Sequence, residues 1–172
     1  KVSGTSVISN LNKEKYDILP IYIDKKGQWH RYEKDIDEIQ ILDIDSDITN
    51  DIKPISNIEN ILKSLDVVFP VLHGLGGEDG SIQGMFELFN IPYIGCGVLA
   101  SSLGMDKAYT KIIFEKAGIK QAKYEYIKKF NDSYIYVDNK FNEEILNTNE
   151  VVKKINNNLK YPMFIKPSNS GS

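Results

Sequence analysis

One stretch constrains the fold more than any other: an apolar run that leads into a glycine-rich loop. Residues 67–72 read Val-Val-Phe-Pro-Val-Leu, and residues 73–80 then supply four glycines, one imidazole and two carboxylates. An unbroken apolar run is typical of a strand buried on both faces of a parallel sheet. In such sheets, ligands collect beyond the carboxyl ends of the strands. We therefore expect the chemistry of the chain to gather near His73.

The first part of the chain alternates predicted strands and helices around this stretch. A helix is expected near the start, and the next segments form a strand and its return strand. A further helix precedes the 65–73 strand, and Asp79 or Ser81 begins a helix that buries Ile82 and Phe86. The predicted ranges before the central strand are 1–12, 16–24, 28–32 and 54–64. This order predicts an α/β fold, with an N-terminal open parallel sheet flanked by helices.

The composition changes after a helix that Asp106 caps and Gly118 ends. Strands are predicted at 121–127 and 131–137, a polar helix at 143–160, and a buried strand at 161–167. These segments predict a second, α+β domain. We place the two domains at 1–105 and 106–172, with the second one incomplete.

Charge and composition exclude several classes of protein. A formal net charge of -3 argues against a nucleic-acid partner, which prefers a basic face. No apolar run approaches the roughly 18 residues of a membrane helix. The single cysteine, Cys96, cannot form an internal disulfide, which fits a cytoplasmic protein. The acidic segment 35–51 lacks the glycine and closing glutamate of a calcium loop, so we expect a solvated strand and loop there.

His73 and Glu78 are the first candidates for a site. A histidine at a strand end is either structural or a substrate contact, and the glycine loop with Glu78 five residues later favours the contact. Glu78 could fix the tautomer of His73, whereas Asp79 is expected to cap a helix. The loop matches neither G-x-G-x-x-G nor the P-loop pattern, so a Rossmann dehydrogenase is unlikely. His30, in a hairpin, is expected at the surface.

Two lysines are the second set of candidates. Lys107 lies in the first turn of a helix, where the dipole prefers anions, so it is either solvated or binds a phosphate together with the helix N-terminus. Lys166 ends an apolar strand, where an unpaired ammonium is costly. Together the two lysines suggest a clamp on a polyphosphate, with the hydroxyl-rich residues 168–172 as a flap.

Four motifs in order resemble the D-alanine-D-alanine ligases of the ATP-grasp superfamily. They are the run Phe69-Pro70-Val71-Leu72-His73-Gly74-x-x-Gly77-Glu78-Asp79-Gly80-x-x-Gln83-Gly84, then Ile91-Pro92-Tyr93-x-Gly95, Met105-Asp106-Lys107, and Phe164-Ile165-Lys166-Pro167-Ser168-x-x-Gly171-Ser172. The resemblance implies a Rossmann-like pre-ATP-grasp domain followed by the start of an ATP-grasp domain. It also implies a cytoplasmic enzyme of peptidoglycan precursor synthesis, commonly a homodimer.

The resemblance assigns roles to individual residues. His73, Glu78 and Val2 belong to the substrate site for the first D-alanine, Lys107 and Lys166 bind the phosphates of ATP, and Ser172 is the active-site serine. ATP and Mg²⁺ (or Mn²⁺) are the implied cofactors, and the implied intermediate is a D-alanyl phosphate. Such a reaction depends on neutralised charge and on a lid that excludes water.

The chain also departs from the family pattern. The opening strand with its Glu-His-Glu-Val-Ser loop is cut to Lys1-Val2-Ser3, and the Mg²⁺ ligands are expected beyond residue 172. We therefore expect a fragment of an active protein that is itself inactive. The alternatives left open are a D-alanine-D-serine or D-alanine-D-lactate ligase, and a non-catalytic module that binds nucleotide or amino acid.

Overall fold

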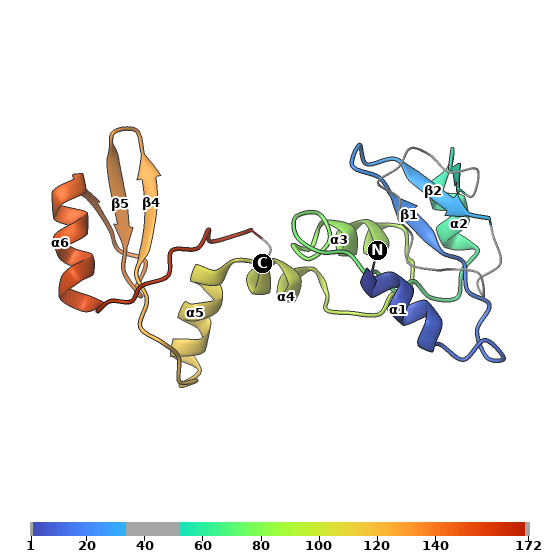
Figure 1. Ribbon diagram of the computed structural model, residues 1–172, viewed down its shortest axis with the longest axis horizontal. Helices are drawn as coiled ribbons and strands as arrows, with labels where there is room; N and C mark the ends of the chain where they lie inside the picture. Colours follow the sequence, from blue (N-terminus) through green and yellow to red (C-terminus); the bar gives the residue numbers. More distant parts are fainter. Residues whose placement is uncertain (1, 34–51, 171–172) are drawn as a thin grey trace. The chain divides into compact units, whose positions relative to one another are not determined.

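The computed structural model describes residues 2–33 and 52–170, which form two compact units. Unit 1 comprises Lys1–Leu72 and Met85–Gly95, and unit 2 comprises His73–Gly84 and Cys96–Ser172 (Figure 1). The predictions for Ser172 and for segment 35–51 lie outside the described residues. The division into domains at 1–105 and 106–172 stays a prediction.

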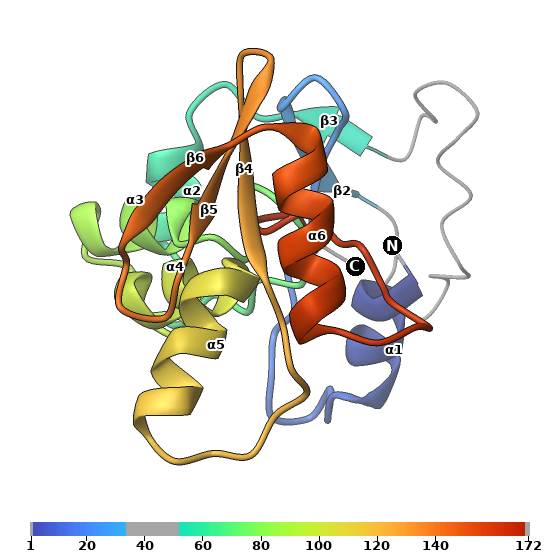
Figure 2. The same ribbon diagram turned by 90° about the vertical axis from the view of Figure 1, so that its left-hand side faces the viewer.

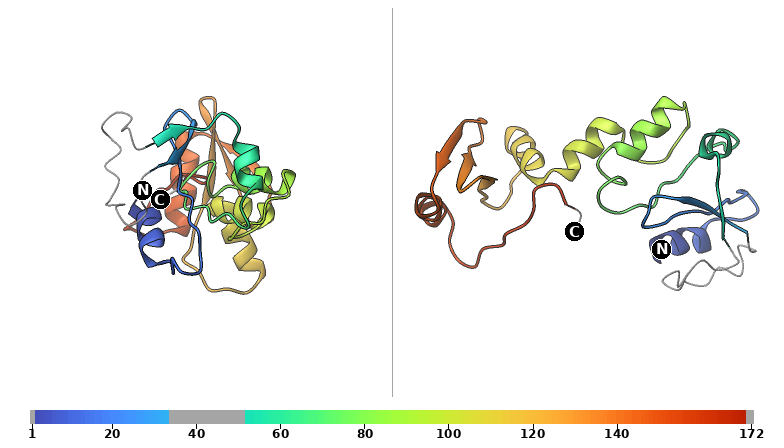
Figure 3. Two further views of the ribbon diagram at one scale, coloured as in Figure 1. Left: turned by 90° about the vertical axis from the view of Figure 1, so that its right-hand side faces the viewer. Right: turned by 90° about the horizontal axis from the view of Figure 1, so that it is seen from above.

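Unit 1 contains a three-stranded antiparallel sheet in the order β1-β2-β3. The strands are β1 (Ile21–Ile23), β2 (Trp29–Tyr32) and β3 (Ile52–Pro54). The predicted hairpin of β1 and β2 is confirmed, and Gly27 turns it with a φ of 79° that favours glycine. Helix α1 (Val2–Asn10) lies beside this sheet (Figure 3). Its Ile8 packs against buried Tyr32 and Ile52.

His30 was expected at the surface, and that prediction is wrong. His30 lies on β2 and is only 5% exposed, and its Nε2 lies 3.2 Å from Asp24 Oδ2. Asp24 already accepts the backbone N–H groups of Lys26 and Gln28 in the hairpin turn. The carboxylate therefore serves both the turn and Nε2 of the buried imidazole, whereas His30 Nδ1 is buried without a hydrogen-bond partner among the described residues.

A parallel sheet was expected around residues 65–73. Within residues 2–33 and 52–170, the parallel pairing there consists of a single bridge. Val68 pairs with Tyr93 through two hydrogen bonds, Val68 N–H to Pro92 O and Ile94 N–H to Val68 O, each 2.8 Å long. Extending this ladder would need an N–H group from Pro92 on one side and from Pro70 on the other. Proline has no such group, so the ladder stops in both directions.

The helices predicted after the glycine loop and after Asp106 are confirmed. Helix α3 (Ser81–Leu88) buries Ile82 and Phe86 as the i, i+4 stripe predicts. Helix α4 (Val98–Met105) leads directly into α5 (Lys107–Lys116), and the hydroxyl of Thr110 on α5 donates to Leu103 O on α4 over 2.5 Å. In unit 1, α2 (Ile58–Lys63) is capped by Asn57 and buries Leu62.

Unit 2 ends in a second antiparallel sheet, in the order β4-β5-β6. The strands are β4 (Tyr126–Phe130), β5 (Ser133–Val137) and β6 (Glu143–Leu146). Helix α6 (Thr148–Asn158) lies along this sheet (Figure 2). Val137 and Leu146 on the sheet and Val151 on the helix are all buried. The α+β character predicted for this part of the chain is confirmed.

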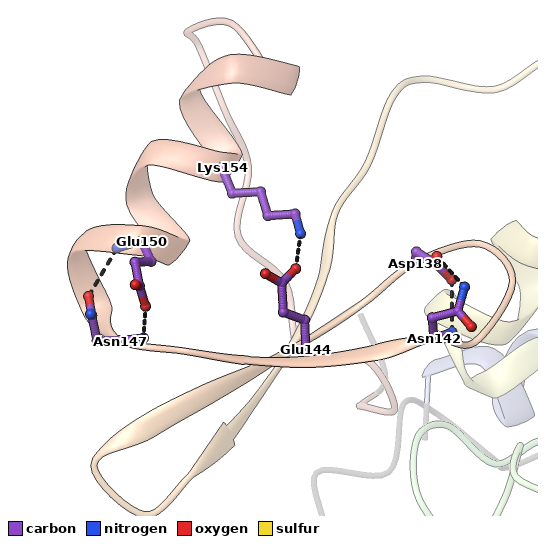
Figure 4. Close-up of polar contacts among 6 residues, drawn as sticks. All are labelled: Asp138, Asn142, Glu144, Asn147, Glu150 and Lys154. Carbon is purple, nitrogen blue, oxygen red and sulfur yellow. Dashed lines mark hydrogen bonds and ion pairs between the residues drawn. The ribbon is translucent and has the colours of Figure 1, made fainter.

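The single polar helix predicted over 143–160 is wrong, because a strand and a shorter helix share that range. The helix begins only after Asn147, whose side chain accepts the N–H of Glu150 while the carboxylate of Glu150 accepts the N–H of Asn147 (Figure 4). This capping box fixes the start of α6 and leaves residues 143–146 to pair with β5. Lys154 on α6 forms an ion pair with Glu144 on β6.

Removing the cap should weaken α6 measurably. We expect Asn147→Ala to lower the free energy of unfolding of the complete protein by about 1 kcal/mol, because it leaves helix N–H groups without an acceptor. Asn157→Ala, on the exposed side of the same helix, is the control and should be neutral or slightly stabilising. Urea unfolding followed by circular dichroism measures both. Equal values for the two variants would show that the cap does not define the helix start.

The buried strand predicted at 161–167 is not formed. No strand pairs with these residues in the described part of the chain, and Phe164 and Ile165 are 85% and 100% exposed. The apolar pattern predicts a buried strand, but a strand needs a hydrogen-bonded neighbour, and neither sheet of the described residues supplies one. Across residues 2–33 and 52–170, no helix has the length and apolar character needed to cross a membrane.

Candidate functional site

The N-terminus of α5 is the centre of the candidate site in unit 2. Asp106 has an extended backbone and caps the helix, because its Oδ1 accepts the N–H groups of Ala108 at 2.9 Å and Tyr109 at 3.2 Å. Lys107 is the first helical residue, as predicted. Its ammonium therefore lies where the helix dipole already favours an anion.

A loop 60 residues further along the chain docks on this helix end. The loop comprises residues 168–170, and we call it the 168–170 loop. Lys107 N–H donates to Ser168 O at 2.8 Å, Lys107 Nζ donates to Ser170 O at 2.6 Å, and Ser168 Oγ donates to Asp106 Oδ1 at 2.6 Å. The structure thus brings together two motifs that are distant in the sequence, Asp106-Lys107 and Ser168-Asn169-Ser170.

Lys166 precedes this loop by two residues and is exposed. The prediction that it ends a buried strand is wrong, so its charge carries no burial cost. Its proposed role in binding phosphate remains a prediction based on the docked loop that follows it. Ser172, the predicted active-site serine, lies outside the described residues.

The glycine loop (residues 73–80) is held by its own carboxylates. Glu78 Oε2 accepts Gly74 N–H at 2.6 Å, and Asp79 accepts Gly76 N–H through Oδ2 at 2.8 Å and Ser81 N–H through Oδ1 at 3.0 Å. These backbone groups therefore serve the fold of the loop.

Two side chains beyond the loop complete its support. Buried Gln83 donates from Nε2 to Gly77 O at 3.0 Å, and Ser102 on α4 donates from Oγ to Asp79 O at 2.7 Å. Gly80 has a φ of 94° and packs against α4 so closely that a Cβ there would lie 2.5 Å from Ser102 Oγ. The loop is therefore a rigid platform fixed to α4, which leads on to Lys107.

The hydrogen bonds from Gly76 and Ser81 lower the pKa of the Asp79 carboxyl below its ordinary value of 3.8. A lowered pKa in the folded state contributes stability above the unfolded pKa, and that contribution is lost as the pH falls through the folded value. We expect Asp79→Asn to cost about 1 kcal/mol at pH 7, because the amide keeps only one acceptor oxygen. The difference from wild type should close as the pH falls below 3.8.

Thermal unfolding of the complete protein from pH 7 to pH 3 measures this difference. Asp132→Asn, an exposed residue in the β4–β5 turn, is the matched control and should follow wild type throughout. A deficit of Asp79→Asn that stays constant over the whole pH range would contradict an ionised carboxylate holding the loop.

The predicted substrate residues are distributed over both units. His73 and Glu78 are exposed in unit 2, and Glu78 holds the N–H of the residue that follows His73. Val2 is 65% exposed at the start of α1 in unit 1. Their roles as substrate contacts stay predictions.

Unit 2 also contains a cavity of about 670 Å³ away from the α5 N-terminus. It lies at the other end of α5, beside Glu115, and its lining includes Tyr124, Tyr136 and Asp138 but neither Lys107 nor Lys166. Burial, and after it the hydrogen bond and charge of Glu125, raise the pKa of the Tyr136 phenol. Among the residues that the structure describes, no three His, Cys, Asp or Glu side chains come together as metal ligands.

Sequence reasoning missed the residues that connect these elements. Asp106 is predicted as a cap, but its bond to Ser168 joins positions 62 apart and leaves no local pattern. Ser102 and Gln83 lie on helices and look like ordinary polar positions. For Gln83, the available signal was its place within the apolar stripe of α3, where a polar residue that is 7% exposed must find a partner.

Comparison with known proteins identifies the family. A family model described as "D-ala D-ala ligase N-terminus" matches residues 1–96. The D-alanine–D-alanine ligase of Acetivibrio thermocellus is 45% identical and is aligned over 100% of this chain but 49% of its own length. D-alanine–D-alanine ligase B of Clostridium tetani is 44% identical, with 99% of this chain and 44% of the relative covered. The chain thus spans about half the length of the relatives it matches.

Solved structures agree with this assignment. The VanG D-Ala:D-Ser ligase from Enterococcus faecalis superposes with a TM-score of 0.70 at 34% identity, covering 99% of this chain and 48% of VanG. The D-alanine-D-alanine ligase from Coxiella burnetii superposes with a TM-score of 0.65 at 30% identity, covering 76% of this chain and 40% of the Coxiella enzyme. On the family match and these similarities together, the chain belongs to the D-alanine–D-alanine ligase family, of which residues 1–96 form the N-terminal region.

Proposed function

We propose that the complete protein containing this chain joins two D-alanines at the expense of ATP, through a D-alanyl phosphate, for peptidoglycan precursor synthesis. The observation that carries the proposal is the docking of the 168–170 loop on the α5 N-terminus beside Lys107. It gathers a helix dipole, an ammonium and a loop rich in hydroxyl groups at one place. Such a place suits a polyphosphate.

The proposed roles of this chain's residues are those that the family resemblance implies. Lys107 neutralises phosphate charge, and Lys166 adds a second ammonium from the segment before the loop. His73 contacts the first D-alanine from the rigid glycine loop, and Glu78 keeps the backbone after His73 in place. Val2, in unit 1, stays a predicted substrate residue. ATP supplies the phosphoryl group that activates the carboxylate.

Mg²⁺ is not assigned to residues of this chain. The described residues bring no set of three metal-binding side chains together, so the roles above use none. A Mg²⁺ requirement of the complete protein, a homodimer and a cytoplasmic location stay predictions.

A D-alanine–D-serine ligase is the second candidate, because the VanG structure is similar over 99% of this chain. The test is release of inorganic phosphate from ATP by the complete protein. With D-alanine as the sole amino acid, we expect phosphate release together with a D-alanyl-D-alanine product detected by mass spectrometry. A mixed product formed in preference when D-serine or D-lactate is added would favour the alternative ligases. Binding of ATP without any phosphate release would favour a non-catalytic module.

A further inference from the structure

Asp106 and Ser168 form a contact that the proposed reaction does not yet explain. The carboxylate of Asp106 accepts three hydrogen bonds, two from the helix that it caps and one from the Ser168 hydroxyl at 2.6 Å. Capping alone would leave the hydroxyl unnecessary. A hydrogen bond to an ionised acceptor is roughly twice as strong as a neutral one, and this contact is partly buried.

The backbone of Lys107 strengthens the same contact. Its N–H is one of the helix N–H groups that lack an intrahelical partner, and Ser168 O accepts it at 2.8 Å. Ser168 is therefore bound to the helix end through both its side chain and its carbonyl. The position of Ser168 therefore determines the path of the chain from Lys166 to Ser170.

The ammonium of Lys107 can hold the loop and a phosphate at once. It carries three N–H donors, and Ser170 O occupies one of them at 2.6 Å. Among the residues that the structure describes, no second acceptor is recorded for this ammonium, so two donors can serve phosphate oxygens without release of the loop. A loop held in this way is already in place when a nucleotide arrives, so less ordering entropy is lost on binding.

We propose that Ser168 is a positioning residue for ATP: its bond to Asp106 holds the segment from Lys166 to Ser170 against the α5 N-terminus. The inference rests on the proposed function, because the nucleotide is the ligand of that site. Ser168 itself does not contact the substrate in this account. It acts through the placement of the loop relative to Lys107.

Steady-state kinetics of the complete protein test the inference. Ser168→Ala should raise the KM for ATP by roughly five- to thirtyfold, as expected for loss of one charge-assisted hydrogen bond. The KM for D-alanine should stay within about twofold, since the glycine loop is held by other contacts. Ser168→Thr keeps the hydroxyl, so its KM for ATP should stay close to that of wild type. Ser101→Ala is the matched control, because it removes a serine hydroxyl on α4 that donates to Cys96 O at 3.2 Å.

A double-mutant cycle with Asp106→Asn separates this role from capping. Asparagine caps a helix about as well as aspartate but lacks the charge. In the double variant Asp106→Asn/Ser168→Ala, the KM for ATP should therefore rise by less than the product of the two single increases, because Asp106→Asn removes the charge that strengthens the same bond that Ser168→Ala removes. If the increase in KM for ATP of the double variant equals the product of the two single increases, the two residues do not act through a shared hydrogen bond.

Hydrogen exchange provides a readout that does not depend on catalysis. Without ATP, Ser168→Ala should speed exchange of the Lys107 amide, which Ser168 O protects, whereas Ser101→Ala should not. An active wild type in which Ser168→Ala changes neither this exchange nor the KM for ATP would overturn the inference alone. Faster exchange in a protein that releases no phosphate would uphold the docking, overturn its role in ATP binding, and count against the proposed function itself.

Discussion

Replacing Lys107 by methionine is expected to lower kcat/KM for ATP of the complete protein by roughly 10²- to 10³-fold, the usual cost of removing one preorganised group that stabilises developing charge. Two effects act together in this variant. The phosphate site loses an ammonium at the helix N-terminus, and the 168–170 loop loses the donor to Ser170 O. Lys166→Met should show a comparable loss in kcat/KM without the second effect.

Lys111→Met is the matched control for Lys107→Met. Lys111 lies one turn further along α5, and its Nζ is 5.0 Å from the centroid of the Tyr124 ring. Its removal should change kcat/KM for ATP by less than about threefold, since exposed cation–π contacts are worth roughly 0.5–1 kcal/mol and none of this acts on the nucleotide. Equal losses in Lys107→Met and Lys111→Met would mean that general charge, rather than a site, attracts the nucleotide.

Gly80→Ala is expected to destabilise the complete protein by about 2–5 kcal/mol, the largest stability effect that we expect. The backbone at φ 94° strains any residue with a Cβ, at about 1–3 kcal/mol. The new Cβ would also lie 2.5 Å from Ser102 Oγ and 2.9 Å from Val98 O, and such overpacking costs a similar amount. Because Val98 O belongs to the backbone of α4, the clash cannot be relieved by a side-chain rotation.

Gly76→Ala separates backbone strain from the clash. Gly76 has a φ of 82°, and a Cβ there meets no atom within 4 Å, so only the strain of about 1–2 kcal/mol applies. Chemical unfolding measures both variants. If Gly80→Ala is no more destabilising than Gly76→Ala, the packing of the glycine loop against α4 is weaker than described.

The amino-acid pattern predicted most helices well because their signals are local. The stripe of α3 and the Asp106 cap of α5 each lie within a few residues of the helix that they define. The extent of a strand depends on its partner strand, and for this reason the predicted parallel sheet around residues 65–73 is wrong. Val68 and Tyr93 form a single bridge because Pro70 and Pro92 interrupt both directions, and this is evident only once the register is known.

The difference between local signals and contacts of distant residues also explains which parts of the site could be predicted. His73, Lys107 and Lys166 were predicted from glycine, helix-terminus and strand-end patterns, and the structure brings Lys107 to the loop that follows Lys166. The bond between Ser168 and Asp106, which holds that arrangement, joins two distant positions with ordinary local roles. The start of α6 shows the intermediate case. Its capping box was readable at Asn147 and Glu150, but the polar composition of 143–160 obscured it.

The most direct test of the central claim is a crystal structure of the complete protein with a non-hydrolysable ATP analogue. The claim is that the α5 N-terminus and the segment from Lys166 to Ser170 bind one triphosphate. The account predicts phosphate oxygens within hydrogen-bond distance of both Lys107 Nζ and Lys166 Nζ, with Ser168 Oγ still on Asp106. An analogue bound elsewhere, with both ammonium groups facing solvent, would contradict it.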